Sequence, residues 1–145
     1  MIVLVHHADA VEPDLDPQRP LSSTGRAHAA RLAADLATRG VKPGAIWHSG
    51  KLRARQTGEA FLRACSPFAA FRMVRGLLPE DPADMMKIQL DAETRDVMLV
   101  GHMPNIAALA ARLAGAHVDF PVHGAVAFER DGDGVWKERW RIEAD

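Results

Sequence analysis

The chain has little of three things that would place it in a specialised class of protein: cysteine, net charge and long apolar runs. Its one cysteine, Cys65, cannot form a disulfide within the chain, which favours a reducing compartment. A net charge of −1 provides no basic field for nucleic acid or a membrane surface. No apolar run approaches the ~20 residues that span a bilayer, and the apolar run at residues 2–5 is too short for a signal peptide. These absences predict a cytoplasmic protein with no nucleic-acid or membrane partner.

Short apolar segments alternate along the chain with segments of helical periodicity. The strand-like runs are residues 2–5, 45–49, 71–74 and 97–100, and the helical patterns cover about 22–39, 53–65, 83–90 and 105–114. Such alternation is typical of a parallel-rich sheet with helices on both faces. Because no internal repeat or long linker interrupts the pattern, residues 1–145 are predicted to form one domain. Its expected architecture is a three-layer α/β/α sandwich with a mainly parallel central sheet.

Two segments are expected to depart from this alternation. Residues 9–20 carry acidic side chains and prolines, which predicts a loop beside the end of the first strand. Residues 126–142 contain two strand-like runs around a turn at 131–134, which predicts a C-terminal hairpin at one edge of the sheet. In the second run Trp136, Trp140 and Ile142 alternate with charged residues, so one covered and one exposed face are expected.

Histidines follow two of the predicted strands directly. Residues 2–5 lead into His6 and His7, and residues 97–100 lead into Gly101 and His102. The carboxyl ends of parallel strands meet at one edge of a sheet, which is where ligands bind in open α/β folds. The strand at 45–49 leads into a helix that carries Arg53. Imidazoles and a guanidinium at this edge indicate an anionic substrate and a histidine nucleophile.

Four segments together resemble the motifs of one family. Residues 3–8 are similar to a strand that ends in Arg-His-Gly or Arg-His-Ala, and residues 21–26 to Leu-Thr-x-x-Gly. Residues 49–57 are similar to Ser-Pro-x-x-Arg-Ala-x-Gln-Thr, and residues 100–105 to Val-x-His-x-Pro. In order and spacing these segments resemble the histidine phosphatase superfamily, which has the phosphoglycerate-mutase-like fold. The short chain is similar to its small SixA-like branch of phosphohistidine phosphatases.

This resemblance implies roles for individual residues. His7 corresponds to the family's attacking histidine, while Arg53 and His102 correspond to residues that bind the transferring phosphoryl group. The predicted catalytic residues are therefore His7, His102 and Arg53, and the predicted substrate-binding residues are His6, Arg53 and His102. The resemblance implies no cofactor and no metal ion. Arg55, two residues beyond Arg53 on the same helix, is expected at the surface.

His6 is the one departure from the family's pattern, which has an arginine there. An imidazole is shorter than a guanidinium and offers at most one donor toward a phosphate. If His6 acts as a cation, bound phosphate should raise its pKa, and activity should fall above about pH 7. The substitution also leaves open a site that has lost efficient turnover.

Three predictions of function follow. The leading one is a metal-independent phosphatase that hydrolyses phosphohistidine in proteins through a covalent phosphohistidine intermediate. A small-molecule phosphomonoesterase and a weakened, phosphate-binding pseudo-phosphatase are the alternatives. The expected partner is thus a phosphorylated protein or a small phosphorylated substrate.

The remaining candidates have weaker signals. Glu80 is a possible general acid, with Asp81 beside it. Two solvent-exposed acidic residues in a proline-bounded loop explain the same segment equally well. His123, before Gly124, lies where it could rim the site, but a surface imidazole is favoured. A metal hydrolase that uses His6, His7 and His102 is disfavoured, because adjacent strand residues point to opposite faces and no metal-binding spacing is present.

Overall fold

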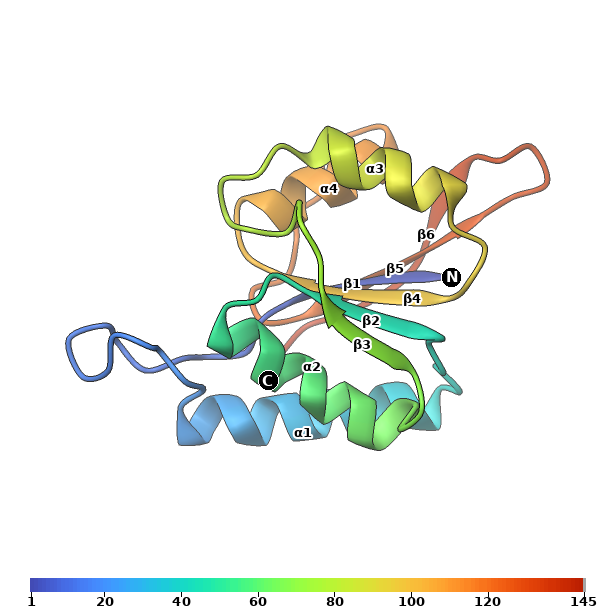
Figure 1. Cartoon of the computed structure of the whole chain (residues 1–145). Helices are drawn as coiled ribbons and strands as arrows, with labels where there is room; N and C mark the ends of the chain where they lie inside the picture. The colour runs from blue at the N-terminus through green and yellow to red at the C-terminus, as the bar shows by residue number, and fades with distance from the viewer. Residues whose placement is uncertain (145) are drawn as a thin grey trace.

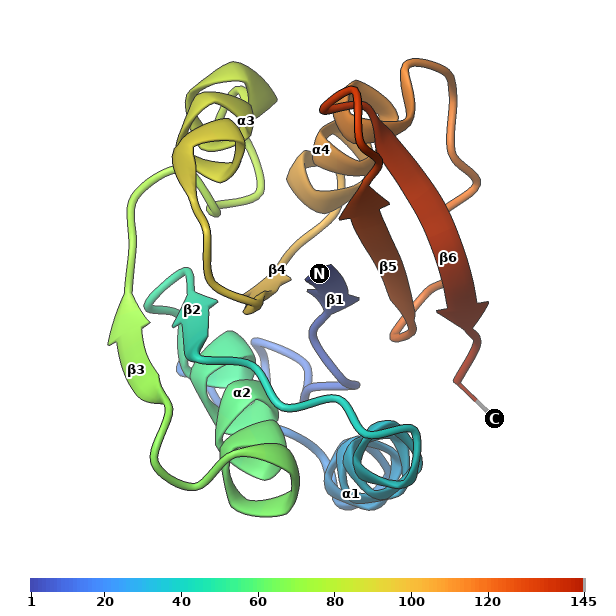
Figure 2. The same cartoon turned by 90° about the vertical axis from the view of Figure 1, so that its right-hand side faces the viewer.

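A computed structural model describes residues 1–144 and contains one sheet between two pairs of helices (Figure 1). The elements are β1 (Ile2–His6), α1 (Ser23–Thr38), β2 (Ala45–His48), α2 (Leu52–Cys65), β3 (Ala70–Met73), α3 (Ala83–Ala92), β4 (Val97–Gly101), α4 (Asn105–Ala114), β5 (Ala125–Arg130) and β6 (Trp136–Ile142). The strand order is β3-β2-β4-β1-β5-β6, and Figure 2 shows this order across the sheet. The predicted α/β class and helix boundaries are confirmed to within a few residues.

The sheet is parallel in its first four strands and antiparallel in its last two. β2 pairs in parallel with β3 and β4, and β4 pairs in parallel with β1. β5 runs antiparallel to β1, and β6 antiparallel to β5, so the C-terminal hairpin lies at an edge as predicted. The central strands β1, β2 and β4 are buried along their whole length, because helices cover both faces.

Alternate side chains of the central strands feed two separate cores. Leu4, Leu99 and Phe128 pack against α3 and α4, whereas Val5, Val100 and Ala127 pack against α1 and α2. Figure 1 shows one helix pair above the sheet and the other below it. Cys65 is buried in the second core, as expected, and burial raises the pKa of its thiol, so it is a packing residue. No helix among residues 1–144 combines the length and apolarity needed to cross a membrane.

The start of α1 is fixed to the loop that follows β1. Ser22 caps the helix by accepting the Gly25 backbone N–H at 3.0 Å, and its hydroxyl donates to the Asp9 carboxylate at 2.6 Å. A Cβ on Gly25 would lie 1.9 Å from the Asp9 carbonyl oxygen, so only glycine allows this approach. The loop at residues 9–22 therefore begins and ends at the same point, beside the carboxyl end of β1.

The expectation of simple alternation in the last strand is wrong. A bulge shifts the register of β6, so that Ala127 pairs with Trp140 and the next residue, Phe128, pairs with Glu138. The extra residue, Arg139, reverses the sense of alternation. As a result Trp136 packs in the core beneath α3 and α4, and Trp140 packs against the core on the opposite face.

Candidate active site

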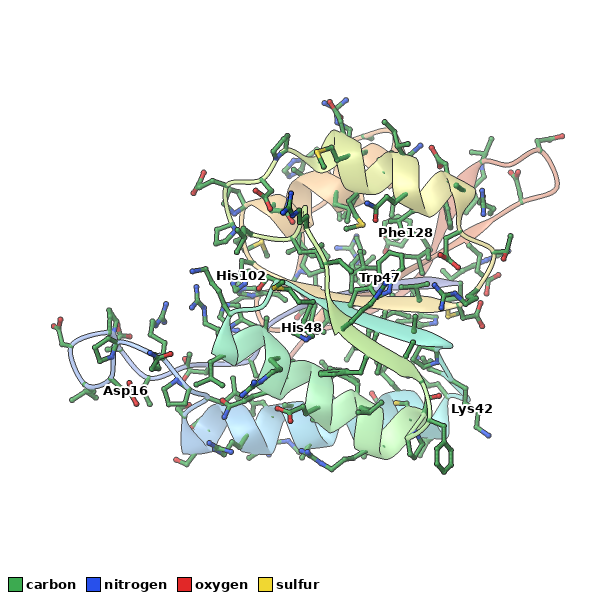
Figure 3. All side chains as sticks on the ribbon, viewed as in Figure 1. Asp16, Lys42, Trp47, His48, His102 and Phe128 are labelled. Carbon is green, nitrogen blue, oxygen red and sulfur yellow. The ribbon has the colours of Figure 1, made fainter. Side chains whose placement is uncertain are left out.

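Four histidines gather at the carboxyl ends of the parallel strands. His6 ends β1 and is in register with Gly101 of β4, so His7 and His102 follow neighbouring strands. The ring centroids of His6 and His7 are 4.6 Å apart, and those of His7 and His102 are 5.0 Å apart. Figure 3 shows His102 at the end of the sheet from which the loop with Asp16 projects. The fourth ring, of His123, stacks on His6 with 4.8 Å between centroids.

His7 is held in one orientation by its own loop. Its backbone N–H donates to the Gly101 carbonyl at 3.0 Å, and its ring Nδ1–H donates to the Ala8 carbonyl at 2.7 Å. With the hydrogen on Nδ1, the lone pair is on Nε2. Burial, opposed by the hydrogen bond to Ala8, lowers the pKa of His7 to about 4. His7 is therefore a neutral imidazole with a free Nε2 lone pair near neutral pH.

His102 is positioned by Ser49, which follows β2. The Ser49 hydroxyl and His102 Nε2 are 2.6 Å apart, and the same hydroxyl accepts the Lys51 backbone N–H at 3.3 Å. This arrangement favours donation from the hydroxyl to Nε2 and a hydrogen on Nδ1. His102 Nδ1 is buried and has no hydrogen-bond partner among the described residues. Burial and the neighbouring His7 lower the pKa of His102 to about 3.

Arg53 brings a permanent positive charge to the same group from the first turn of α2. Its charge contributes to the lowered pKa of His6, His7 and His102, so the guanidinium lies within electrostatic range of all three rings. Its Nε is buried without a partner among residues 1–144. Thr57 ties this turn to the histidine loop, because its hydroxyl donates to the Arg53 carbonyl at 2.8 Å and accepts the Ala8 backbone N–H at 3.0 Å.

Two buried nitrogens at the site, one on His102 and one on Arg53, have no hydrogen-bond partner among residues 1–144. Buried donors are costly unless they are hydrogen-bonded, and these two lie near a nucleophilic nitrogen. A tetrahedral oxyanion has the acceptors that would satisfy them. The site is therefore suited chemically to binding a phosphoryl group in front of His7 Nε2.

In the unliganded protein His6 does not meet the condition of acting as a cation near neutral pH. His6 is 8 % exposed, and burial together with the charge of His7 lowers its pKa to about 3. Its Nδ1 accepts the backbone N–H of His123 at 2.8 Å, so the neutral ring carries its hydrogen on Nε2. His6 is thus a neutral hydrogen-bond donor, because tertiary burial outweighs the intrinsic basicity of imidazole.

His6, His7 and His123 also form a group whose ring nitrogens lie within 4.8 Å of one another. Two of these rings donate Nδ1–H to backbone carbonyls, His7 to Ala8 and His123 to His7, which is a common arrangement around metal-bound histidine. His6 does not fit such a site, because accepting an N–H at Nδ1 places its hydrogen on Nε2. To bind a metal ion through Nε2, His6 would need a lone pair on that nitrogen. The group is therefore better suited to an anion than to a metal ion.

Arg19 is a charged residue near the site that the sequence analysis missed. It lies in the predicted loop with a left-handed φ of 48°, and its Nε–H donates to the Val11 carbonyl at 3.0 Å. Its charge contributes to the lowered pKa of His7 and Arg53, so it lies near both. The sequence offered no local signal for this position, since a loop has no periodicity that would assign a face and a residue before proline favours an extended backbone.

The side chains of the other candidate residues contact their own loop or helix, or solvent. The Asp81 carboxylate accepts the Leu78 backbone N–H at 2.9 Å and so stabilises its own loop. Glu80 is exposed on that loop, and its role as a general acid stays a prediction. Arg55 is exposed and lies 3.9 Å from Glu59, as expected of a surface residue.

The lowered histidine pKa values predict loss of stability in acid. The pKa values of His6, His7 and His102 fall from an ordinary 6.5 to about 3, 4 and 3 in the folded protein. Below about pH 6.5 the unfolded chain binds protons that the folded chain does not, so the free energy of unfolding falls as pH falls toward about 4. Each of the three histidines lowers the free energy of unfolding by up to ~1.4 kcal/mol per pH unit as pH falls through this window.

Urea unfolding at about pH 7 and about pH 5 measures this loss. His102→Gln removes one of the buried groups, so it should reduce the difference in unfolding free energy between the two pH values. His117→Gln, at an exposed histidine, is the matched control and should leave the difference unchanged. Equal effects of the two substitutions would contradict the prediction.

This chain is similar to known proteins in both sequence and fold. The model of the histidine phosphatase superfamily (branch 1) matches residues 3–76. The protein histidine phosphatase SixA complexed with tungstate is similar in structure, with a TM-score of 0.87, 21% identity, and coverage of 98% of this chain and 96% of that chain. A candidate phosphohistidine phosphatase SixA from Agrobacterium tumefaciens has a TM-score of 0.81 at 26% identity, over 99% of this chain and 97% of the other.

A curated protein is also similar to this chain in sequence. It is an uncharacterized chloroplastic protein of Arabidopsis thaliana, 26% identical over 97% of this chain and 71% of its own length. The family model covers the strand with His6 and His7 and the helix with Arg53, and the structural matches extend over the segment with His102. The chain therefore belongs to the histidine phosphatase superfamily (branch 1), a family of phosphatases, and has the fold of its SixA-like members.

Proposed function

We propose that the protein is a phosphatase that hydrolyses phosphohistidine in proteins through a covalent intermediate on His7, without a metal ion. One observation carries this proposal. His7 donates its Nδ1–H to the Ala8 carbonyl, which leaves Nε2 as a lone pair on a ring that is neutral near pH 7. The nitrogens of His102 and Arg53 that have no partner within residues 1–144 are suited to the oxygens of the group that this lone pair would attack.

The first half of the reaction transfers the phosphoryl group to the enzyme. His7 Nε2 forms a bond to phosphorus as the bond from phosphorus to the substrate imidazole nitrogen breaks. Arg53 contributes a permanent charge, and His102 and His6 contribute N–H donors, to the negative charge spread over the phosphoryl oxygens. His102 and His6 are held by hydrogen bonds to Ser49 and His123, so these two donors reorganise little during transfer. The leaving imidazole needs a proton, which solvent or an acidic side chain supplies.

The second half returns the enzyme to its starting state. Water attacks the phosphorus of phospho-His7, the phosphorus–Nε2 bond breaks, and the Nε2 lone pair is restored while inorganic phosphate leaves. The hydrogen bond from Nδ1 to Ala8 persists through both steps, so His7 keeps its tautomer. The same oxyanion donors act in both halves.

Two considerations support phosphohistidine as the substrate. The names of the two SixA proteins describe that activity for them, and this chain shares their fold over nearly its whole length. In addition, imidazole is a better leaving group than an alkoxide, so a phosphohistidine substrate requires less help from a general acid. This suits a site in which Glu80 is exposed and Asp81 is bonded to its own loop.

A comparison of substrates tests the proposal. Purified protein is incubated with a phosphohistidine-bearing protein, with p-nitrophenyl phosphate and with sugar phosphates, each with and without a chelator. We expect kcat/KM to be highest for the phosphohistidine protein and unchanged by the chelator. Preference for a sugar phosphate would instead identify a small-molecule phosphomonoesterase, and loss of activity in chelator would contradict metal independence.

The histidine at position 6 favours one second candidate, a phosphate-binding protein with weak turnover. Because His6 is neutral, the site lacks one permanent cation of the family's pattern. His6→Arg should raise kcat/KM about tenfold, the scale of one charged hydrogen bond. His6→Gln, which keeps a neutral N–H donor, is the control and should not produce this gain. If the arginine variant gains no activity over the glutamine variant, the missing charge does not limit turnover.

A further inference from the structure

We propose that His123 is a substrate-binding residue, and that the stacked pair of His6 and His123 performs the anion-binding role of the family's missing arginine. The inference rests on the proposed function only in that both place an anion in front of His7. In this pair His6 supplies a neutral donor, and His123 supplies the positive charge by taking up a proton when the anion binds.

His123 is held against His6 by its backbone and its ring. Its backbone N–H donates to His6 Nδ1 at 2.8 Å, and its ring Nδ1–H donates to the His7 carbonyl at 2.7 Å. The two rings are nearly parallel, with an interplanar angle of 6° and centroids 4.8 Å apart. His123 thus contacts both His6, the last residue of β1, and His7, which follows it, through two hydrogen bonds and a stacked ring.

The backbone at His123 is unusual in a way that these contacts explain. Its φ is 58°, a left-handed conformation that is uncommon for histidine and persists only where surrounding contacts fix it. The following residue must be glycine, because a Cβ on Gly124 would lie 2.3 Å from the Ile142 carbonyl oxygen. The Gly124 carbonyl in turn accepts the His6 backbone N–H at 3.0 Å. The turn therefore fixes His123 beside the end of β1.

The hydrogen bonds determine which nitrogens remain for a ligand. His6 accepts at Nδ1, so its Nε2–H is a donor, and His123 donates from Nδ1, so its Nε2 can take up a proton. One ring nitrogen from each of His6, His7 and His123 lies within 4.8 Å of the other two. A protonated His123 and a neutral His6 would together offer two N–H donors from two stacked planes.

Burial favours His123 over His6 as the ring that carries a proton when an anion is bound. His6 is buried, and the charge of His123 is among the causes that lower its pKa, so the two stacked rings do not readily share two charges. His123 is only half-buried. The charged side chains that act on His6 and His7 are Arg53 from α2, Arg19 from the loop at 9–22, and the histidines themselves, including His7 and His123. None of these groups, which act on His6 and His7, is a carboxylate, so a dianion bound in front of His7 would bring negative charge to the imidazoles and would stabilise a proton there.

Sulfate is the probe that tests the pair, because it remains a dianion across the range in which imidazoles titrate, about pH 5 to about pH 8. Calorimetry of sulfate binding in buffers of different ionisation enthalpy measures affinity and proton uptake together. We expect wild-type protein to take up a proton, and to bind sulfate about tenfold more weakly at about pH 8 than at about pH 6. His123→Asn should bind sulfate about tenfold more weakly at about pH 6 and lose the proton uptake.

Asparagine is the appropriate replacement because it tolerates the left-handed backbone and keeps the N–H that bonds His6. His123→Arg restores a permanent charge and should make sulfate affinity nearly independent of pH over the same range. His117→Asn, at an exposed histidine, is the control for removing an imidazole elsewhere. Sulfate affinity and proton uptake in His123→Asn equal to those of wild type would overturn the pairing.

The outcome is distinguishable from failure of the proposed function. Sulfate binding is measured without turnover, so the role of His123 stands or falls on calorimetry alone. A protein that binds sulfate through His123 but hydrolyses no phosphohistidine substrate would retain this inference and contradict the proposed substrate.

Discussion

Replacing His7 by alanine is expected to lower kcat for the phosphorylated substrate by about 10⁴-fold or more, the scale seen when a nucleophile is removed from an enzyme. The reason is that the proposed reaction has one nitrogen that can attack phosphorus. His7 Nε2 is free because Nδ1 is bonded to the Ala8 carbonyl, and it is neutral because burial lowers the pKa of the ring to about 4. The ring centroid of His102 lies 5.0 Å from that of His7, and its Nε2 is already hydrogen-bonded to the Ser49 hydroxyl, so it offers no free lone pair.

The measurement has a kinetic and a covalent part. Wild-type protein incubated with labelled phosphohistidine protein should acquire acid-labile label at His7, and the alanine variant should acquire none. A cooperative urea transition at about pH 7 and retained sulfate binding serve as controls that the variant is folded, and loss of the buried ring and of its hydrogen bond to Ala8 should lower the urea midpoint without abolishing the transition. Label that appears at another residue, or turnover within tenfold of wild type, would sink the proposal that His7 is the nucleophile.

The sequence predicts the strand-end residues of this site well, for a physical reason. His7 and His102 follow apolar runs that are buried on both faces, and parallel strands bring their carboxyl ends to one edge whatever the details of packing. Arg53 lies in the first turn of the helix after β2, where the same rule applies. The position of each residue is thus determined by local periodicity together with the topology of the sheet.

Residues placed by loops were not predictable in this way. Arg19 and His123 both have left-handed backbones. Arg19 donates to Val11 across its own loop, and His123 is bonded to the distant His6 and His7. The bulge at Arg139, which moves Trp140 to the opposite face, likewise has no period-two signal. Such features depend on tertiary contacts that periodicity does not record.

The charge state of His6 illustrates the same limit for electrostatics. Its ordinary pKa makes an imidazole near neutral pH partly charged, which is the basis of the original expectation. The structure places it 8 % exposed beside two other imidazoles and Arg53, so its pKa falls to about 3. Burial and neighbouring charge, both products of the fold, decide the protonation of this ring. Near neutral pH His6 therefore contributes a neutral N–H donor to the site and no positive charge.

Replacing Arg53 by alanine is expected to lower kcat/KM by about 10²–10³-fold, the effect of removing one fixed donor to a developing oxyanion. Both kcat and KM should change, because a permanent charge is useful before and during phosphoryl transfer. Arg53→Lys should recover only part of the loss, since an ammonium lacks the planar pair of donors. Arg55→Ala is the matched control from the same helix, and because Arg55 is exposed and pairs with Glu59 on that helix, its effect should stay within about twofold.

The Arg53→Ala variant has a second readout that does not depend on turnover. The charge of Arg53 contributes to the lowered pKa of His6, His7 and His102, so its removal should raise all three values toward the ordinary range. The shift should be partial, because burial is the largest cause for each ring and alanine leaves burial nearly intact. Titration followed by NMR measures it, with Arg55→Ala again as the control. If kcat/KM falls while the three histidines titrate as in wild type, Arg53 acts through the fold of α2 instead of through its charge at the site.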